Sequence, residues 1–373
     1  MLIGSWTHTS KDQEPPPEHL RPNDNVELDQ ASLFIAGGLG NHLGGFAQVT
    51  YDGVGRSWSW DNLDLRAVTS TKLSGADLLV GLTINNNPTV EDPWNTLSAW
   101  GFPYTSTAVS PTPAAGLLID GPLAQNVLGA SIYAWLGHKF YVEGGAYSTP
   151  SSGTLDFLGA DPTHPGAIHG VAPYGRTAVQ ADVGGGTFEA GANILKASIF
   201  PGRDASSAFS DSYTDWGVDA SYLRQLGAHD ALSASVRFEH EQGDLRASCA
   251  LGLLGDDSNL GCARYHLNEW RASVRYTRND RLGLTLSPFS ISGSRNFNLY
   301  GGNGLPNSNG LMGQVDYTLW PNGNSPFGPL VNVRIGAQYT IYGKFNGRRH
   351  NFDGLGGNAR DNDALRAFAW LAF

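Results

Sequence analysis

Hydrophobic and polar residues alternate along the chain in recurring segments of about 9 to 13 residues. Residues 330–342 are the clearest example. One face there carries Val331, Val333, Ile335, Ala337, Tyr339 and Ile341, and the other carries Asn332, Arg334, Gly336, Gln338 and Thr340. Because successive side chains of a strand point to opposite faces, this period of two predicts strands with one apolar and one polar face.

The same pattern predicts about sixteen strands, an even number that is typical of an antiparallel transmembrane β-barrel. They lie near residues 2–8, 29–37, 44–52, 57–68, 76–84, 127–136, 139–147, 174–183, 186–198, 213–224, 230–241, 267–278, 281–291, 311–320, 330–343 and 363–373. We expect a β-bulge within residues 57–68, since the apolar face switches there from Trp58 and Trp60 to Leu63 and Leu65. The fold class is therefore all-β, with residues 1–373 forming a single barrel domain.

Short turns and long polar loops alternate between these strands. The short connections include LGNHLG, LGHK, GGG, LGAHDA and RNDR, and the DGVGR link after Tyr51 is short where a long loop is expected. Outer-membrane barrels have short periplasmic turns and longer extracellular loops. We therefore expect the short set to be periplasmic and the long set to be extracellular.

Composition agrees with a barrel that has a wet interior. The chain has 373 residues, 48 Gly, 16% charged residues and 11% aromatic residues, and its mean hydropathy is -0.25. No apolar run approaches the roughly 20 residues of a spanning helix, so a bilayer crossing would use strands. The net charge of -10 argues against nucleic acid as a partner.

Two cysteines, Cys249 and Cys262, flank a segment rich in Gly, Asp, Ser and Asn. We expect a loop disulfide, which fits an oxidising compartment, and two free thiols are the alternative. The N-terminus, MLIGSWTHTSKDQE, lacks the features of a signal peptide. Because a barrel needs export, we expect either a mature chain or a true start upstream of Met1.

The longest connection, residues 85–126, is the segment in which we expect function. Connections of this length are usually functional or disordered. The aromatic residues Trp94, Trp100, Phe102 and Tyr104 argue for order. We expect the segment to fold into the lumen as a constriction or plug, with Glu91, Asp92, Trp94 and Trp100 at the pore. An external flap without effect on permeation is the alternative.

Charged residues on the inward-facing positions are unevenly distributed. Carboxylates dominate the earlier strands, as Glu143, Asp182, Glu189 and Asp219, and arginines dominate the later ones, as Arg237, Arg271, Arg275, Arg334 and Arg366, interrupted by Glu239, Glu269 and Asp316. Opposed charges across a channel create a transverse field that sets ion selectivity. The alternative is that these charges pair and stiffen the wall.

Motifs for catalysis or metal binding do not occur in the sequence. There is no H-E-x-x-H, C-x-x-C, G-x-S-x-G or Walker-type loop. We therefore expect no catalytic residue, no metal site and no enzyme activity. An outer-membrane hydrolase is an alternative for which no residue spacing gives support.

The last ten residues, ALRAFAWLAF, alternate and end on Phe373. This ending resembles the final strand of bacterial outer-membrane barrels, which the barrel assembly machinery reads. The resemblance implies the bacterial outer membrane as the location, with outer-membrane lipid and the assembly machinery as partners.

Four blocks narrow the resemblance to one family. GSWTHTSKDQ, NDNVELDQASLFIAGGLG, WDNLDLRA and NNNPTVEDPWNTLSAWGFPY resemble the porin-like part of fused monohaem cytochrome–porins of the outer membrane. Iron-oxidising members of that family carry electrons through a haem bound at C-x-x-C-H.

No C-x-x-C-H occurs in residues 1–373. This chain therefore holds no c-type haem unless an upstream segment supplies the motif. We expect an outer-membrane channel for passive diffusion of small polar solutes or ions. The alternative is the barrel half of an electron-transfer cytochrome–porin, with periplasmic electron carriers as partners.

Overall fold

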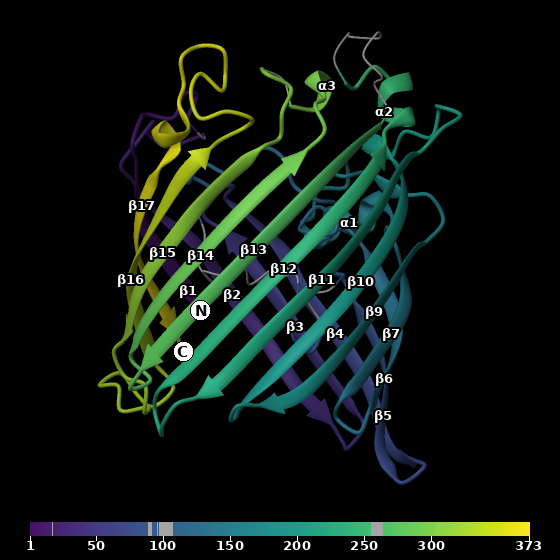
Figure 1. The fold of residues 1–373 in the computed structure, drawn as a ribbon, viewed down its shortest axis with the longest axis vertical. Coiled ribbons are helices and arrows are strands. Elements are labelled where there is room, and N and C mark those ends of the chain that lie inside the picture. The colour runs from purple at the N-terminus through teal and green to yellow at the C-terminus, as the bar shows by residue number, and fades with distance from the viewer. Residues whose placement is uncertain (17, 89–91, 95, 97–106, 255–263, 301) are drawn as a thin grey trace.

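The alternating segments fold into antiparallel strands that form one ring (Figure 1). The computed structural model describes residues 1–373 except 17, 89–91, 95, 97–106, 255–263 and 301. The described residues contain sixteen long strands and one strand of two residues, β8. The strands are β1 (Leu2–Thr9), β2 (Asn25–Leu39), β3 (Leu43–Asp52), β4 (Ser57–Leu73), β5 (Ala76–Asn85), β6 (Leu128–Leu136), β7 (Phe140–Ser148), β8 (Ala167–Ile168), β9 (Ala172–Val183), β10 (Gly186–Phe200), β11 (Asp211–Gln225), β12 (Ala231–Asp244), β13 (Arg264–Arg278), β14 (Leu282–Gly293), β15 (Ser308–Thr318), β16 (Asn332–Lys344) and β17 (Ala364–Ala372).

Short helices occur only in the connections of the described chain. They are α1 (Ser152–Leu158), α2 (Arg246–Ala250) and α3 (Phe297–Tyr300), with 3-10 turns at Pro201–Arg203 and Ala359–Asn362. Among the described residues, no helix has the length and apolar character needed to span a membrane.

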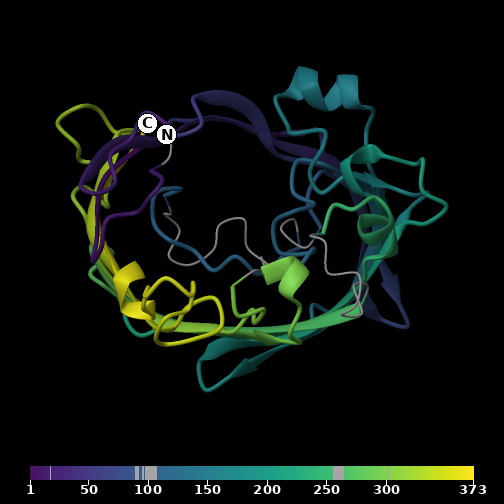
Figure 2. The ribbon, with the colours of Figure 1, turned by 90° about the horizontal axis from the view of Figure 1, so that it is seen from above.

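The ring closes between the first and last strands. β1 pairs with β2 on one side and with β17 on the other, where Leu2 lies opposite Leu371 and Trp6 opposite Ala367. Each remaining long strand pairs with its neighbours in chain order, with β7 joined directly to β9. The sheet therefore has no open edge, and Figure 2 shows the ring from above. The expectation of an antiparallel barrel of about sixteen strands is confirmed.

Strand positions agree with the sequence pattern, including the bulge in β4. Ala47 lies opposite Leu63 and Val49 lies opposite Trp60, so β4 contains one extra residue at this point. The bulge moves the apolar face from Trp60 to Leu63, as the switch in the sequence predicted. β4 continues to Leu73, beyond the predicted end at residue 68.

Connections at the two ends of the barrel differ in length. Residues 40–42, 74–75, 137–139, 184–185, 226–230 and 279–281 form short turns at one end. The β15–β16 connection at the same end, residues 319–331, is longer than the alternation predicted. At the other end the β3–β4 link, residues 53–56, is short, as its sequence indicated.

The two faces of the sheet have opposite chemistry. On β12, Val236 is 49% exposed on the outside, while its neighbour Arg237 is only 8% exposed on the inside. The other strands also carry exposed apolar side chains on the outside, and Leu33, Ile35 and Ile132 are among the most exposed. A soluble protein buries its aliphatic side chains, so an exterior of this kind is suited to hydrocarbon.

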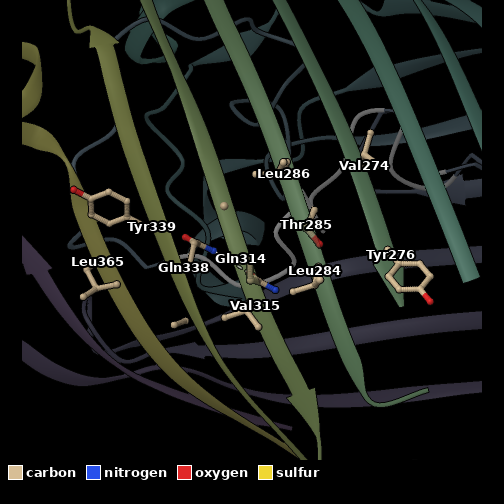
Figure 3. Close-up of a pocket in the computed structure, with 12 residues that line it drawn as sticks. Val274, Tyr276, Leu284, Thr285, Leu286, Gln314, Val315, Gln338, Tyr339 and Leu365 are labelled. Atoms are coloured by element: carbon tan, nitrogen blue, oxygen red, sulfur yellow. Dashed lines mark hydrogen bonds between the residues drawn. The ribbon is translucent and has the colours of Figure 1, made fainter. Parts of the chain in front are cut away.

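A shallow hollow of about 580 Å³ lies on this outer surface, across β13–β17. Figure 3 shows Val274, Leu286, Val315 and Tyr339 among the residues that line it. The small residues Gly313 and Ala337 are among those lining it. The hollow belongs to the apolar exterior, whereas the charged side chains of the strands lie inside the ring.

Candidate functional site

The described residues of the connection between β5 and β6 lie inside the ring (Figure 2), and we call residues 85–126, which include the last residue of β5, the lumen segment. The Thr107 hydroxyl donates to Glu27 Oε1 on β2 at 2.8 Å. The Tyr342 hydroxyl on β16 donates to the carbonyl oxygen of Pro111 at 2.7 Å. The described part of the segment is therefore bonded to inward-facing side chains of the wall.

The second half of the lumen segment forms an apolar core with the inner wall. Leu117, Ile119 and Leu123 are each at most 2% exposed. The wall residues of this core are Tyr147, Ile168, Ala172, Tyr174, Leu195, Ala197, Ile199, Leu267 and Ile291. Burial of three large aliphatic side chains stabilises the docked segment by several kcal/mol, at about 1.5–3 kcal/mol per side chain.

Two wall carboxylates accept hydrogen bonds from the backbone of the same stretch. The Leu118 amide donates to Glu241 Oε2 at 2.5 Å, and the Ile119 amide donates to Asp215 Oδ2 at 2.9 Å. The Tyr265 hydroxyl donates to the other oxygen of Glu241 at 2.6 Å. Because buried backbone amides need acceptors, these carboxylates fix the depth at which the segment lies in the barrel.

Asp120 forms the next contact with the wall. Its Oδ2 lies 2.6 Å from Arg237 Nη2 and 3.6 Å from Arg271 Nη2. Glu269 bonds both arginines, at 2.7 Å in each case. Burial raises the pKa of Asp120, but the two guanidinium groups outweigh it and lower the pKa from 3.8 to about 2. Asp120 is therefore ionised at neutral pH and held by positive charge.

Arg176 on β9 binds the first half of the lumen segment. Its guanidinium lies 2.8 Å from Asp219, 3.0 Å from Glu189 and 3.4 Å from Asp92. The Arg176 side chain is fully buried, and its guanidinium carbon lies 5.5 Å from the centre of the Trp94 ring. One cation thus holds three carboxylates, of which Asp92 belongs to the segment and the other two to the wall.

Trp94 extends this contact into a cluster of aromatic residues. Its ring packs edge-on against Tyr141 at 5.1 Å and Trp135 at 5.5 Å, and its Nε1 donates to Gln180 Oε1 at 3.1 Å. The Tyr141 hydroxyl donates to Glu143 Oε2 at 2.7 Å. Trp94, Asp92 and Glu143 therefore lie together at the inner wall of β7 and β9.

The arginines of the later strands pair with nearby carboxylates. Arg275 binds Asp316 through both terminal nitrogens, at 2.8 and 2.9 Å, and Arg334 lies 3.6 Å from the same carboxylate. Arg366 pairs with Asp29 on β2, across the closure of the ring. These pairs neutralise much of the segregated charge locally, and a selectivity-setting field stays a prediction. Asp182 lies apart, exposed near the β9–β10 turn.

An internal hollow of about 310 Å³ lies between the lumen segment and the wall of β10–β14. Trp94, Thr96 and Asp120 line it from the segment, and Arg237, Arg271 and Arg275 are among the wall residues. No group of His, Cys, Asp and Glu suited to a metal ion occurs in the described part of the chain. The chemistry of the hollow is that of hydrogen bonding and charge pairing.

Some predicted positions lie outside the described residues. These are Glu91, Trp100, Phe102, Tyr104 and Cys262. Cys249 is disulfide-bonded, and its pairing with Cys262 stays a prediction.

The charged residues of the site that the sequence interpretation missed include Arg176, Asp120, Asp215 and Glu241. Arg176 and Asp182 are separated by an even number of residues on β9, so the alternation indicates that Arg176 faces inward, but it does not show that three carboxylates converge on Arg176. Asp120 directly follows the apolar run Leu117–Ile119. An apolar run next to an acidic residue was the signal in the sequence that this part of the segment is buried and paired with a charge on the wall.

Comparisons with known proteins agree on the fold. No protein-family model matches the chain, and no curated protein matches it. OprB of Pseudomonas putida is similar in structure, with a TM-score of 0.57 and 13% identity over 100% of this chain and 92% of that one. The outer membrane channel DcaP of Acinetobacter baumannii has a TM-score of 0.52 and 12% identity over 100% of this chain and 95% of that one.

At these identities the likeness shows a shared barrel fold. It leaves the resemblance to fused cytochrome–porins as a prediction.

Proposed function

We propose that the chain is a porin-like channel of the bacterial outer membrane through which small polar solutes or ions diffuse passively. The observation that carries this proposal is the inversion of the barrel, with aliphatic side chains outside and charged groups inside. A closed sheet of this kind leaves no backbone group unpaired in hydrocarbon and gives polar solutes a hydrophilic path. The fold that it shares with an outer membrane channel supports the proposal.

The lumen segment is the constriction in this proposal. Its described residues are bonded to β2, β9, β11, β12 and β16, and they fill part of the interior on the side of the long loops. Because buried ion pairs and an apolar core hold the lumen segment in place, it narrows the path permanently and does not move each time a solute passes. We therefore expect permeation to fall with solute size.

Swelling of proteoliposomes tests the proposal. Vesicles containing the refolded barrel are diluted into isotonic solutions of a pentose, a hexose, a disaccharide and a trisaccharide. We expect swelling rates that decrease in this order, because each larger sugar fits the constriction less well. Vesicles that received unfolded chain are the control. Rates equal to this control for every solute, with the barrel shown to be inserted, contradict the proposal.

The electron-conduit role depends on sequence that residues 1–373 do not contain. Within the described residues we find no observation that favours it over diffusion, so it stays the second prediction from the family resemblance. The barrel assembly machinery and periplasmic electron carriers stay predicted partners in the same way.

A further inference from the structure

A row of serines crosses the inner wall where the internal hollow lies. Ser221 on β11 is opposite Ser235 on β12, and Ser235 is opposite Ser273 on β13. All three residues line the hollow. Since serine side chains are short, the row forms a shelf in a wall whose neighbouring positions carry long charged side chains.

Arginines lie two residues away on each side of this row. Arg237 and Arg271 face each other across β12 and β13 on one side, and Arg275 lies opposite Ser233 on the other. In both directions the spacing keeps the side chains on the inner face, because strand side chains alternate. The serine shelf therefore lies between two levels of guanidinium groups.

Exposure distinguishes these arginines. The side chain of Arg271 is 48% exposed, whereas that of Arg237 is 9% exposed and that of Arg275 is 13% exposed. Arg271 bonds Glu269 through Nε at 2.7 Å, and the contact of its Nη2 with Asp120 is long, at 3.6 Å. The terminal edge of the Arg271 guanidinium is thus the charged group that a solute in the hollow meets.

The hydroxyls of the shelf also differ in what they bind. Ser221 donates to Glu189 at 3.1 Å. Ser235 is exposed and Ser273 half-buried in the hollow beside Arg271. A guanidinium edge pairs with a carboxylate through two parallel bonds, and serine hydroxyls both donate to and accept from solute hydroxyls. The hollow has a volume of about 310 Å³, so a solute held in it must be small.

We propose that Arg271, Ser235 and Ser273 form a subsite for small hydroxylated carboxylates, such as six-carbon sugar acids. Arg271 binds the carboxylate, and Ser235 and Ser273 bind the hydroxyl groups next to it. The carboxylates around the hollow are less exposed than Arg271: the side chains of Asp120, Asp219 and Glu189 are 16%, 7% and 2% exposed, and each is bound to an arginine. The subsite rests on the proposed channel function and names a solute class for it.

Interruptions of the ion current by added solute measure binding in the channel. Gluconate, glucose and propionate are compared, because glucose lacks the carboxylate and propionate lacks the hydroxyl groups. We expect gluconate to interrupt the current at concentrations about tenfold or more below those of either analogue. Arg271→Gln should remove this preference over glucose, and the double change Ser235→Ala and Ser273→Ala should remove the preference over propionate.

Arg278→Gln is the matched control. Arg278 lies on the same strand, near the short turn and on the opposite parity from Arg271, so the preference for gluconate should be unchanged. The shift in electrophoretic mobility on heating shows that each variant is folded. Equal interruption by glucose and gluconate, unaffected by Arg271→Gln, overturns the proposal, as does equal interruption by propionate and gluconate.

A channel that is inserted but silent contradicts the proposed function instead. Titration calorimetry of the folded barrel in detergent then tests the subsite separately. Gluconate heat that is lost in Arg271→Gln and kept in Arg278→Gln supports the subsite, and the absence of binding by the unchanged protein overturns it.

Discussion

Replacing Asp120 by asparagine removes the negative charge through which the lumen segment binds Arg237 and Arg271. The change keeps the size of the side chain and leaves the apolar core of Leu117 and Ile119 in place. The docked segment should therefore remain in the barrel but be held less firmly. The wall arginines keep Glu269, so no guanidinium is left without a carboxylate.

The magnitude follows from the pKa of Asp120, which docking lowers from 3.8 to about 2. A lowering of this size corresponds to roughly 2 kcal/mol of docking free energy. Asp120 is only 16% exposed, so solvent screens this contribution little. Loss of this contribution should raise the undocked fraction of the segment by roughly tenfold to a hundredfold.

The sign of the pH dependence follows from the same values. Ionised Asp120 stabilises docking, so the contribution is complete above the ordinary pKa of 3.8 and is lost as the pH falls through about 2. The contribution of Asp120 to docking should be the same at pH 7 and at pH 5, and the open-channel noise that arises from its loss should increase as the pH falls towards 2. Asp120→Asn should show the added noise already at pH 7.

Single-channel recording in planar bilayers measures this noise, and the rate of cleavage of the segment by an added protease measures undocking independently. Asp204→Asn is the control, since Asp204 lies in the exposed connection between β10 and β11. The reasoning is refuted if Asp120→Asn has the noise and the cleavage rate of the unchanged protein at pH 7.

Three further changes test other contacts. Leu117→Ala removes a fully buried side chain from the core inside the barrel, and we expect a loss of about 2–5 kcal/mol of docking free energy, seen as faster proteolysis of the segment; unchanged proteolysis argues against a packed core. Arg176→Met leaves three carboxylates without their shared cation and should lower the free energy of unfolding in urea by about 3–5 kcal/mol. Arg246→Met breaks an exposed ion pair and should lower it by less than about 1 kcal/mol. Equal urea midpoints for the two variants would contradict this expectation. Leu286→Arg places a charge on the outer face and should destabilise the barrel in vesicles by about 2–4 kcal/mol. Leu355→Arg lies in an exposed loop and should leave the stability unchanged. Equal effects of the two changes would argue against a lipid-facing position for Leu286.

The strands were predictable because one face of each had to be apolar. In β16 every second residue from Val333 is apolar, and in β12 Val236 and Arg237 take opposite faces as neighbours. The bulge in β4 was visible for the same reason, since one extra residue exchanges the two faces. The β15–β16 connection breaks the alternation of short and long connections. The predicted strands already left residues 321–329 between them, and the observed connection is residues 319–331. A longer turn leaves the pattern within the strands unchanged.

The contacts of the lumen were not predictable from the pattern. Arg176 meets Asp219, which lies 43 residues away in sequence, and Arg237 meets Asp120, which lies 117 residues away. Such pairs depend on the register of every intervening strand and on the path of the lumen segment. The aromatic residues of that segment suggested order, and Trp94 does pack against the wall, but the larger core uses the aliphatic residues Leu117, Ile119 and Leu123, which the pattern did not single out.

Single-channel conductance in a planar bilayer tests most directly whether the ring encloses a continuous aqueous path. The barrel described here should insert through its aliphatic exterior and conduct, with a current that is proportional to voltage and rises with salt concentration. A barrel that is shown to be inserted and folded but carries no current would contradict the account.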